Sequence, residues 1–130
     1  MNIPTELKYT ESNEWIKLEG KTGTIGISDY AQDQLSDIVF AEVLVNEGDS
    51  IKKGDAIATI ESVKAADDVY SPVSGTVVST NEGLSTPPEL INNDPYGAAW
   101  IVKIELQDTA EIDPLLDSTG YEKIIQEQQQ

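Results

Sequence analysis

Two strand-like runs flank a single lysine near the middle of the chain, and they constrain the fold more than any other feature. Residues 57–60 before Lys64 and residues 69–70 after it are mostly types that favour β-strands. The residues between the runs are few, small and polar, which predicts a hairpin with Lys64 at or near its tip. Gly54 lies ten residues before Lys64 and Gly75 lies eleven residues after it, so the hairpin joins two similar halves.

Further strand-like runs, separated by turn residues, extend along the rest of the chain. We expect strands over residues 15–18, 22–27, 38–45, 76–78 and 99–105. The continuous apolar part of 38–45 predicts a buried strand. Many short strands with frequent turns are typical of a mainly β sandwich or barrel.

Two short helices and one long loop complete the expected fold. Ser28 is a good N-cap for a short helix that includes Leu35. The tail from Asp117 predicts a helix that packs through Ile124 and Ile125. Residues 81–95 are rich in Asn, Gly and Pro, which predicts a loop. At 130 residues the chain predicts one domain, 1–130, whose last part, 118–130, is a helix with a frayed end.

The composition excludes several classes of function. Without cysteine or histidine the chain has no disulfide, no catalytic triad built on either residue and no ordinary transition-metal site, so no metal is expected. The net charge of −16 comes from 24 acidic residues and 8 lysines, which disfavours nucleic-acid and membrane binding. An independent enzyme is the least favoured reading.

The segment around Lys64 resembles a known modification motif. Residues 61–75, Glu-Ser-Val-Lys-Ala-Ala-Asp-Asp-Val-Tyr-Ser-Pro-Val-Ser-Gly, are similar to the lipoyl-lysine motif of the glycine cleavage H protein family. Stretches within 9–16, 26–40 and 88–100 also resemble that family, in the family's order. The resemblance implies a mainly β, flattened lipoyl/biotinyl-type barrel-sandwich hybrid with short helices, including one at the C-terminus.

The resemblance also implies a role as a non-catalytic carrier. Lipoic acid would be attached to Lys64 through an amide, by a lipoate ligase or an octanoyltransferase. The carrier would take an aminomethyl group from a pyridoxal-phosphate-dependent glycine decarboxylase and pass it to a tetrahydrofolate-dependent aminomethyltransferase. A dihydrolipoamide dehydrogenase would then reoxidise it.

Six further positions match family positions with implied roles. Glu61 matches an acidic residue that lipoylating enzymes recognise. The residues expected to shelter the lipoyl arm are Ser12, Glu14, Ile27, Leu35 and Asp68. A protonated amine prefers carboxylate and hydroxyl acceptors, and an apolar cleft excludes water.

The chain departs from the family pattern at a few positions. Asn13 stands where the family usually has His, Ser36 where it has Gly, and Ala98-Ala99 where it has an acidic residue and Gly. These differences bear on partner fit more than on lipoylation.

Three other readings stay open. A lipoate relay would donate lipoyl groups to 2-oxoacid dehydrogenase complexes. A biotin carrier usually has methionines beside its lysine, whereas here the neighbours are Val63 and Ala65. An unmodified β-rich interaction module is the third. No run approaches membrane-spanning length and no targeting pattern is evident, so we expect a monomer in the cytoplasm of a bacterium or archaeon.

Overall fold

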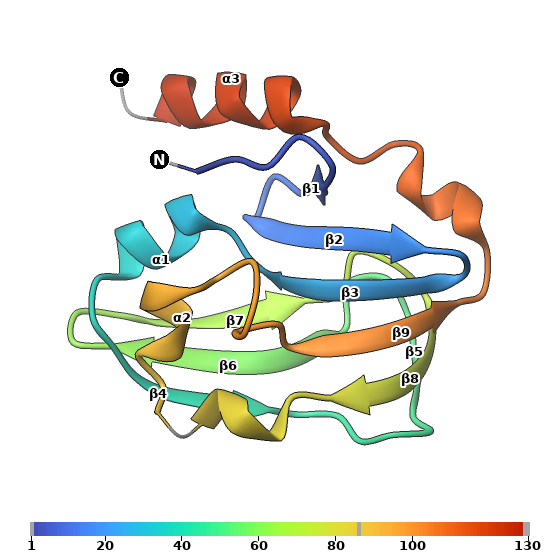
Figure 1. Cartoon of the computed structure of the whole chain (residues 1–130), viewed down its shortest axis with the longest axis horizontal. Coiled ribbons are helices and arrows are strands. Elements are labelled where there is room, and N and C mark those ends of the chain that lie inside the picture. Colours follow the sequence, from blue (N-terminus) through green and yellow to red (C-terminus); the bar gives the residue numbers. More distant parts are fainter. Residues whose placement is uncertain (1, 86, 129–130) are drawn as a thin grey trace.

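Two antiparallel β-sheets form a flattened sandwich (Figure 1). The computed structural model describes residues 2–85 and 87–128. The six-stranded sheet consists, in order, of β1 (Lys8–Tyr9), β2 (Glu14–Glu19), β3 (Thr22–Ile27), β9 (Val102–Leu106), β8 (Gly75–Thr80) and β5 (Ser50–Ile51). The three-stranded sheet consists of β4 (Ile38–Val43), β6 (Ala56–Ser62) and β7 (Ala66–Tyr70). The predicted mainly β sandwich class with short helices is confirmed.

The main core lies between the two sheets. Ile16 and Ile25 are cross-strand partners in the six-stranded sheet, and both are fully buried. Ile60 and Val69 reach the same apolar cluster from the three-stranded sheet. Successive strand residues face opposite sides, so alternate positions supply this core. Each fully buried side chain of this size contributes roughly 1.5–3 kcal/mol.

The helices partly match the sequence expectation. Helix α1 (Asp29–Leu35) begins after Ser28, whose Oγ accepts a 3.1 Å hydrogen bond from the Ala31 N–H, as an N-cap does. The loop predicted over 81–95 is wrong, because it contains the 3-10 helix η1 (Glu82–Ser85) and the single turn α2 (Leu90–Asn93). The prolines before α2 are compatible with a helix start, where no N–H is needed. Within the described residues no helix is long and apolar enough to cross a membrane.

A second apolar cluster lies outside the six-stranded sheet, under the C-terminal helix α3 (Ser118–Gln128). The N-terminal segment runs along the inner side of this helix (Figure 1). The helix predicted from Asp117 is confirmed; Ile125 is buried and Ile124 is partly buried. The fully buried Tyr121 was not predicted as a packing residue. The end predicted to fray covers 128–130; Gln128 is the last residue of α3, and 129–130 lie outside the described residues.

The buried strand predicted over 38–45 is wrong in its burial. Strand β4 ends at Val43, and its pairing with β6 shifts register between Ile38 and Phe40. Val39 and Phe40 are 56% and 41% exposed. A register shift of this kind alters which face successive side chains occupy, so the apolar run does not point continuously into the core.

Of two further predicted strands, one is confirmed and the other begins later than predicted. The strand predicted over 76–78 lies within β8, whereas the one predicted from Ala99 begins at Val102. Ile101 N donates a 2.8 Å hydrogen bond to Ile25 O just before β9 begins, which extends the contact with β3 beyond the regular ladder.

Candidate functional site

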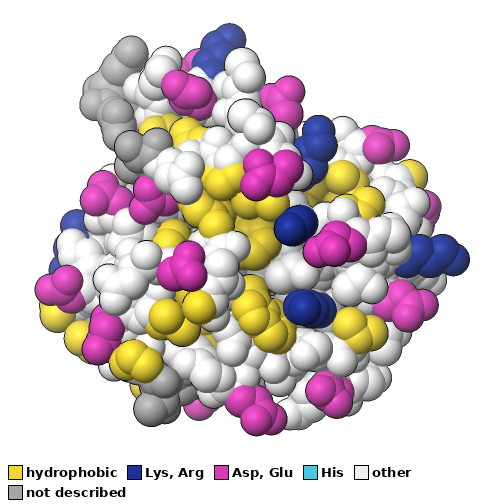
Figure 2. Space-filling view, in the orientation of Figure 1, with side chains coloured by type: hydrophobic (Ala, Val, Ile, Leu, Met, Phe, Trp, Pro, Cys, Tyr) yellow, Lys and Arg dark blue, Asp and Glu magenta, His cyan; other side chains and the backbone are white. Residues whose placement is uncertain are grey.

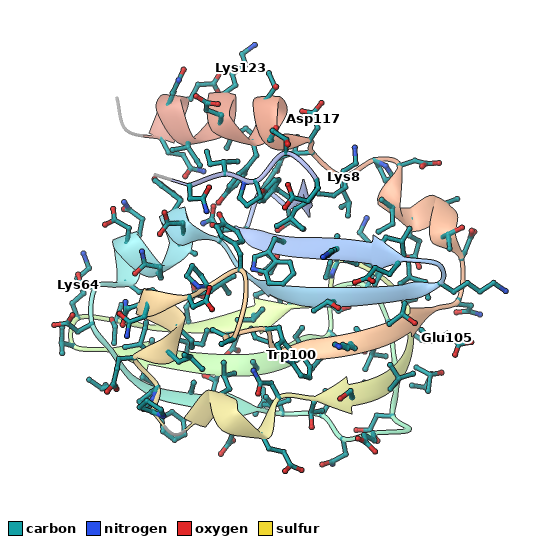
Figure 3. The ribbon with its side chains drawn as sticks, in the orientation of Figure 1. Lys8, Lys64, Trp100, Glu105, Asp117 and Lys123 are labelled. Atoms are coloured by element: carbon teal, nitrogen blue, oxygen red, sulfur yellow. The ribbon has the colours of Figure 1, made fainter. Side chains whose placement is uncertain are left out.

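Lys64 lies at the tip of the β6–β7 hairpin, as the sequence predicts. The side chain is exposed and stands at the margin of the molecule (Figure 3). The Ser62 hydroxyl accepts hydrogen bonds from the N–H groups of Lys64 (3.3 Å) and Ala65 (3.1 Å) and donates one to Ala65 O (3.1 Å). A serine hydroxyl that binds backbone groups two and three residues ahead tightens a turn. Ser62 therefore presents Lys64 on a constrained tip, a role that the sequence analysis missed.

The hairpin tip is also anchored to the neighbouring strand. Val63 N donates a 3.1 Å hydrogen bond to Asp37 O, just before β4. Among the described residues, the only ion pair within 4.0 Å joins Lys17 to Glu19, at 3.9 Å. The Lys64 ammonium therefore takes no part in an ion pair there, and its conversion to an amide would break none.

A cleft of about 100 Å³ opens between the start of β2, helix α1 and the β6–β7 hairpin. Five sequence-predicted residues line it: Ser12, Glu14, Ile27, Leu35 and Asp68. They come from four separate parts of the chain, so the fold brings together what the sequence keeps apart. Their roles remain predictions.

Glu14 is the most unusual group in this cleft. Its side chain is only 3% exposed. Oε1 accepts 2.6 Å hydrogen bonds from the hydroxyls of Thr10 and Ser12, and Oε2 accepts one from Tyr70 N at 3.3 Å. Burial raises the pKa of Glu14 above its ordinary value, and the nearby Asp67 adds slightly to the rise, although the three hydrogen bonds oppose it.

The cleft combines apolar walls with acidic groups. Ile27, Ile60 and Val69 are buried beside it, while Asp67 and Asp68 are exposed on its rim. Such a lining fits an apolar chain that ends in a cationic or hydrogen-donating group. Asp68 lies four residues from Lys64 along β7, roughly 13 Å at the rise of a strand, so only a long group on Lys64 would reach it.

A larger hollow of about 550 Å³ lies on the other side of Glu14. It shares only Ser12 and Glu14 with the five cleft residues and includes Tyr9 and Leu116. Of the two hollows, the smaller cleft is therefore the better candidate site, because it gathers all five residues that are predicted to shelter the lipoyl arm. Among the described residues no group of three or more acidic side chains is placed to hold a metal ion.

Comparisons with known proteins agree with this geometry. The model of the glycine cleavage H-protein family matches residues 7–128. The chain belongs to the glycine cleavage H-protein family. It is 50% identical over 126 residues to the glycine cleavage system H protein of Carboxydothermus hydrogenoformans, covering 97% of this chain and 96% of that protein. The corresponding protein of Acidobacterium capsulatum is 52% identical over 128 residues, with 98% of each chain covered.

A solved structure from the same family confirms the fold. The crystal structure of a glycine cleavage system H protein from Mycobacterium marinum superposes with a TM-score of 0.83 at 29% sequence identity. The match covers 93% of this chain and 97% of that chain.

Glu61 occupies a different position from the other predicted residues of this H-protein family member. It lies on β6, is exposed, and pairs in register with Phe40 on one side and Ala66 on the other. The cleft lining does not include it. Glu61 therefore lies on the outer surface near the hairpin tip that carries Lys64.

Two departures from the H-protein pattern have unusual backbones. Asn13 has φ 74° and lines the cleft. Ser36, which ends α1, has φ 68° and ψ −148°, a region that only glycine occupies easily. Ala98 N donates a 2.9 Å hydrogen bond to Asp94 Oδ2, and Ala99 is buried.

Other cleft residues were missed by the sequence analysis. Gln34 and Asp67 line the cleft, and Thr10 donates to Glu14 from outside its lining. Asp67 stands beside the predicted Asp68 on β7. Strand alternation predicts that the two side chains point to opposite faces, but it does not say which of them faces the cleft, and both line it. Thr10 lies four residues before Glu14 across an irregular turn, and no local pattern marks that contact.

Proposed function

We propose that this chain is a lipoyl-lysine carrier that shuttles the aminomethyl group of glycine from glycine decarboxylase to the tetrahydrofolate-dependent aminomethyltransferase, and is then reoxidised by dihydrolipoamide dehydrogenase. Lipoic acid would be joined to Lys64 through an amide. The observation that carries the proposal is an exposed Lys64 on a hydrogen-bonded tip beside a cleft with a buried carboxylate. When bound, the lipoyl group supplies a dithiolane that undergoes the redox and transfer chemistry.

In this proposal Lys64 provides reach and access. The turn that carries this flexible side chain is held by backbone and Ser62 hydrogen bonds. A modifying enzyme therefore finds the base of the side chain in one fixed position. Amide formation removes the positive charge of the side chain. The carried group can then approach an apolar cleft without the cost of desolvating an ammonium at its base.

The cleft residues provide shelter for a carried amine. Glu14, with Asp68 at the rim, offers anionic acceptors, and Ser12 adds a hydroxyl. Ile27 and Leu35 supply apolar surface that keeps water away from the amine-bearing carbon. The sequence contains neither histidine nor cysteine, and the chain is proposed to be non-catalytic, with the chemistry supplied by the three partner enzymes.

The proposal includes the cellular setting. A lipoate ligase or an octanoyltransferase would modify Lys64, with Glu61 as part of its recognition surface. The carrier would work as a monomer in the cytoplasm, the compartment that we propose it shares with the three enzymes. Acidic side chains are spread over the face in Figure 2, around hydrophobic ones, which suits steering toward basic partner surfaces.

Intact-mass analysis after incubation with lipoate ligase, ATP and lipoate tests the attachment. We expect one lipoyl increment, mapped to Lys64 and absent in Lys64→Ala. Lys21→Ala is the matched control, since Lys21 is an exposed lysine in the β2–β3 turn. An unchanged mass, under conditions that modify a known lipoyl domain, would overturn the carrier proposal.

The pathway is tested separately on the lipoylated protein. Glycine decarboxylase should catalyse exchange of labelled bicarbonate into the glycine carboxyl group only when the lipoylated chain is added. Lipoylated chain that fails this assay, yet passes its lipoyl group to an acyltransferase domain of a 2-oxoacid dehydrogenase, would show a lipoate relay instead.

A further inference from the structure

Tyr121 of α3 is fully buried against Tyr9 of β1. Their rings stack with centroids 4.6 Å apart and an angle of 3° between planes. Tyr9 is itself fixed by two backbone hydrogen bonds with Leu116, at 2.8 and 2.9 Å. This ring pair explains how α3 docks, and packing of this kind requires no hydroxyl.

The Tyr121 hydroxyl nevertheless forms two hydrogen bonds far from α3 in sequence. It donates to Asn13 Oδ1 at 2.9 Å and lies 2.5 Å from Ser28 Oγ. Because the single Tyr121 proton goes to Asn13, Ser28 donates to Tyr121 and uses a lone pair to accept from Ala31 N. A tyrosine hydroxyl is protonated at neutral pH, and burial raises the pKa of Tyr121 still further above it.

These two partners belong to two different elements beside the cleft. Asn13 lines the cleft between Ser12 and Glu14. Ser28 caps α1, whose Ala31 also lines the cleft. Ser28 N also donates a 2.9 Å hydrogen bond to Asn13 O, so the backbone joins the Asn13 turn to the start of α1 at one point, and the Tyr121 hydroxyl joins the side chains of Asn13 and Ser28 at a second.

We propose that Tyr121 is a positioning residue, whose hydroxyl fixes the Asn13 turn relative to the start of α1 and thereby sets the shape of the cleft. This inference rests on the proposed function, in which the cleft shelters the group carried on Lys64. It assigns the C-terminal helix a part in that shelter, although in Figure 1 the N-terminal segment runs between α3 and α1.

The test compares Tyr121→Phe with Tyr9→Phe. Each variant removes one hydroxyl from the same ring stack, but the Tyr9 hydroxyl donates to Pro4 O at 2.6 Å rather than bonding Asn13 and Ser28. In the unmodified protein, amide hydrogen exchange at Ala31 should accelerate about fivefold in Tyr121→Phe. Exchange at Val77 on β8, whose N–H donates a 2.9 Å hydrogen bond to Asp49 O, should stay unchanged in both variants.

The second readout is the half-life of the carried aminomethyl group on lipoylated protein, measured as its spontaneous release into water. Tyr121→Phe should shorten this half-life by about fivefold, the effect of one lost hydrogen bond, and Tyr9→Phe should leave it unchanged. Asn13→Gly tolerates the positive φ and removes the acceptor of the Tyr121 hydroxyl, so it should also shorten the half-life; it replaces Tyr121→Phe as the test variant if the latter folds poorly.

The two proposals fail in different ways. The positioning role would be overturned if the amide exchange rate at Ala31 in Tyr121→Phe equalled that of the wild type. It would also be overturned if this rate changed equally in both tyrosine variants. A chain that gains no lipoyl mass would overturn the carrier function, and the exchange at Ala31 would still decide whether Tyr121 holds the Asn13 turn against the start of α1.

Discussion

The Ser12 hydroxyl donates a 2.6 Å hydrogen bond to Glu14 Oε1, and Thr10 donates another of the same length to the same oxygen. Both hydroxyls lie in the turn just before β2, so the partners of Glu14 are supplied locally. A carboxyl that is 3% exposed needs such donors, because an unpaired buried charge is strongly destabilising. The acidic end of the cleft is therefore already formed before anything binds there.

Glu14→Gln should change how stability depends on pH. Burial raises the pKa of Glu14 in the folded chain, so this state keeps the proton to higher pH than the unfolded chain, whose ordinary value is about 4.3. The stability that Glu14 contributes in this way is fully present below the unfolded pKa and is lost as pH rises through the folded pKa. The free energy of unfolding of the wild type should therefore fall relative to that of Glu14→Gln over this window, and remain level above it.

Urea denaturation in steps from pH 4 to pH 9 measures this difference. Glu11→Gln is the control, because Glu11 is an exposed carboxylate three residues away. A difference between wild type and Glu14→Gln that stays constant across the window would show that the buried carboxyl does not titrate as its burial requires.

Ser36→Gly should stabilise the protein by about 1 kcal/mol. Ser36 holds φ 68° and ψ −148°, a conformation that costs a non-glycine residue roughly 1–3 kcal/mol. Glycine removes that strain. Its greater conformational entropy in the unfolded chain offsets roughly 0.4–1 kcal/mol of the stability gained. Chemical denaturation of the two proteins gives the difference directly.

Asn13→Gly is the informative comparison for Ser36→Gly. Asn13 also has a positive φ, at 74°, but its Oδ1 accepts the hydrogen bond from Tyr121. Glycine would relieve the backbone and remove that bond, so Asn13→Gly should gain less than Ser36→Gly. A loss of stability in Ser36→Gly would contradict the strain argument.

The sequence revealed most of what depends on local patterns. The Lys64 hairpin follows from strand-forming residues on both sides of a short polar segment, and Ser28 is recognisable as a cap from its position alone. The resemblance placed Ser12 and Glu14 beside Asp68, residues more than fifty positions apart. The cleft itself could not be inferred from spacing.

What the sequence hid depends on contacts between distant segments or on single backbone angles. Tyr121 and Ser28 are 93 residues apart, and the apolar pattern of α3 does not show where a hydroxyl points. The exposure of Phe40 follows from a register shift in the pairing of β4 with β6. The serine at position 36 gives no signal of its positive φ; the glycine that the family usually has there is the one hint of it.

Gly75→Ala should destabilise the protein by more than 3 kcal/mol or prevent folding. Gly75 pairs with Leu106 of β9 and with Ile51 of β5, so strands lie on both sides of it. An added Cβ would clash with the backbone oxygen of Glu105, which cannot move without breaking the ladder. Thermal denaturation, or the soluble yield if the variant does not fold, measures the effect.

Gly83→Ala is the matched control for this position. Its added Cβ would meet only Asn81 Oδ1, at 3.4 Å, which is ordinary contact. The substitution also lowers the entropy of the unfolded chain, so its stability should stay within about 0.5 kcal/mol of the wild type or rise. Equal losses in Gly75→Ala and Gly83→Ala would point to a general cost of alanine rather than to the close approach of Glu105.

Glu61→Gln should slow lipoylation of Lys64 without changing the fold. Glu61 is exposed on β6 near the hairpin tip, where a carboxylate can attract a basic enzyme surface. Loss of an exposed charge at an interface lowers the association rate, so we expect about a tenfold lower rate at low salt and a smaller difference at high salt. The initial rate of mass increment under limiting lipoate ligase measures it.

Glu42→Gln removes an exposed carboxylate on neighbouring β4, opposite Thr59, and should leave the rate near that of the wild type. Equal slowing in both variants would assign the effect to net charge, and no slowing in either would remove Glu61 from the recognition surface.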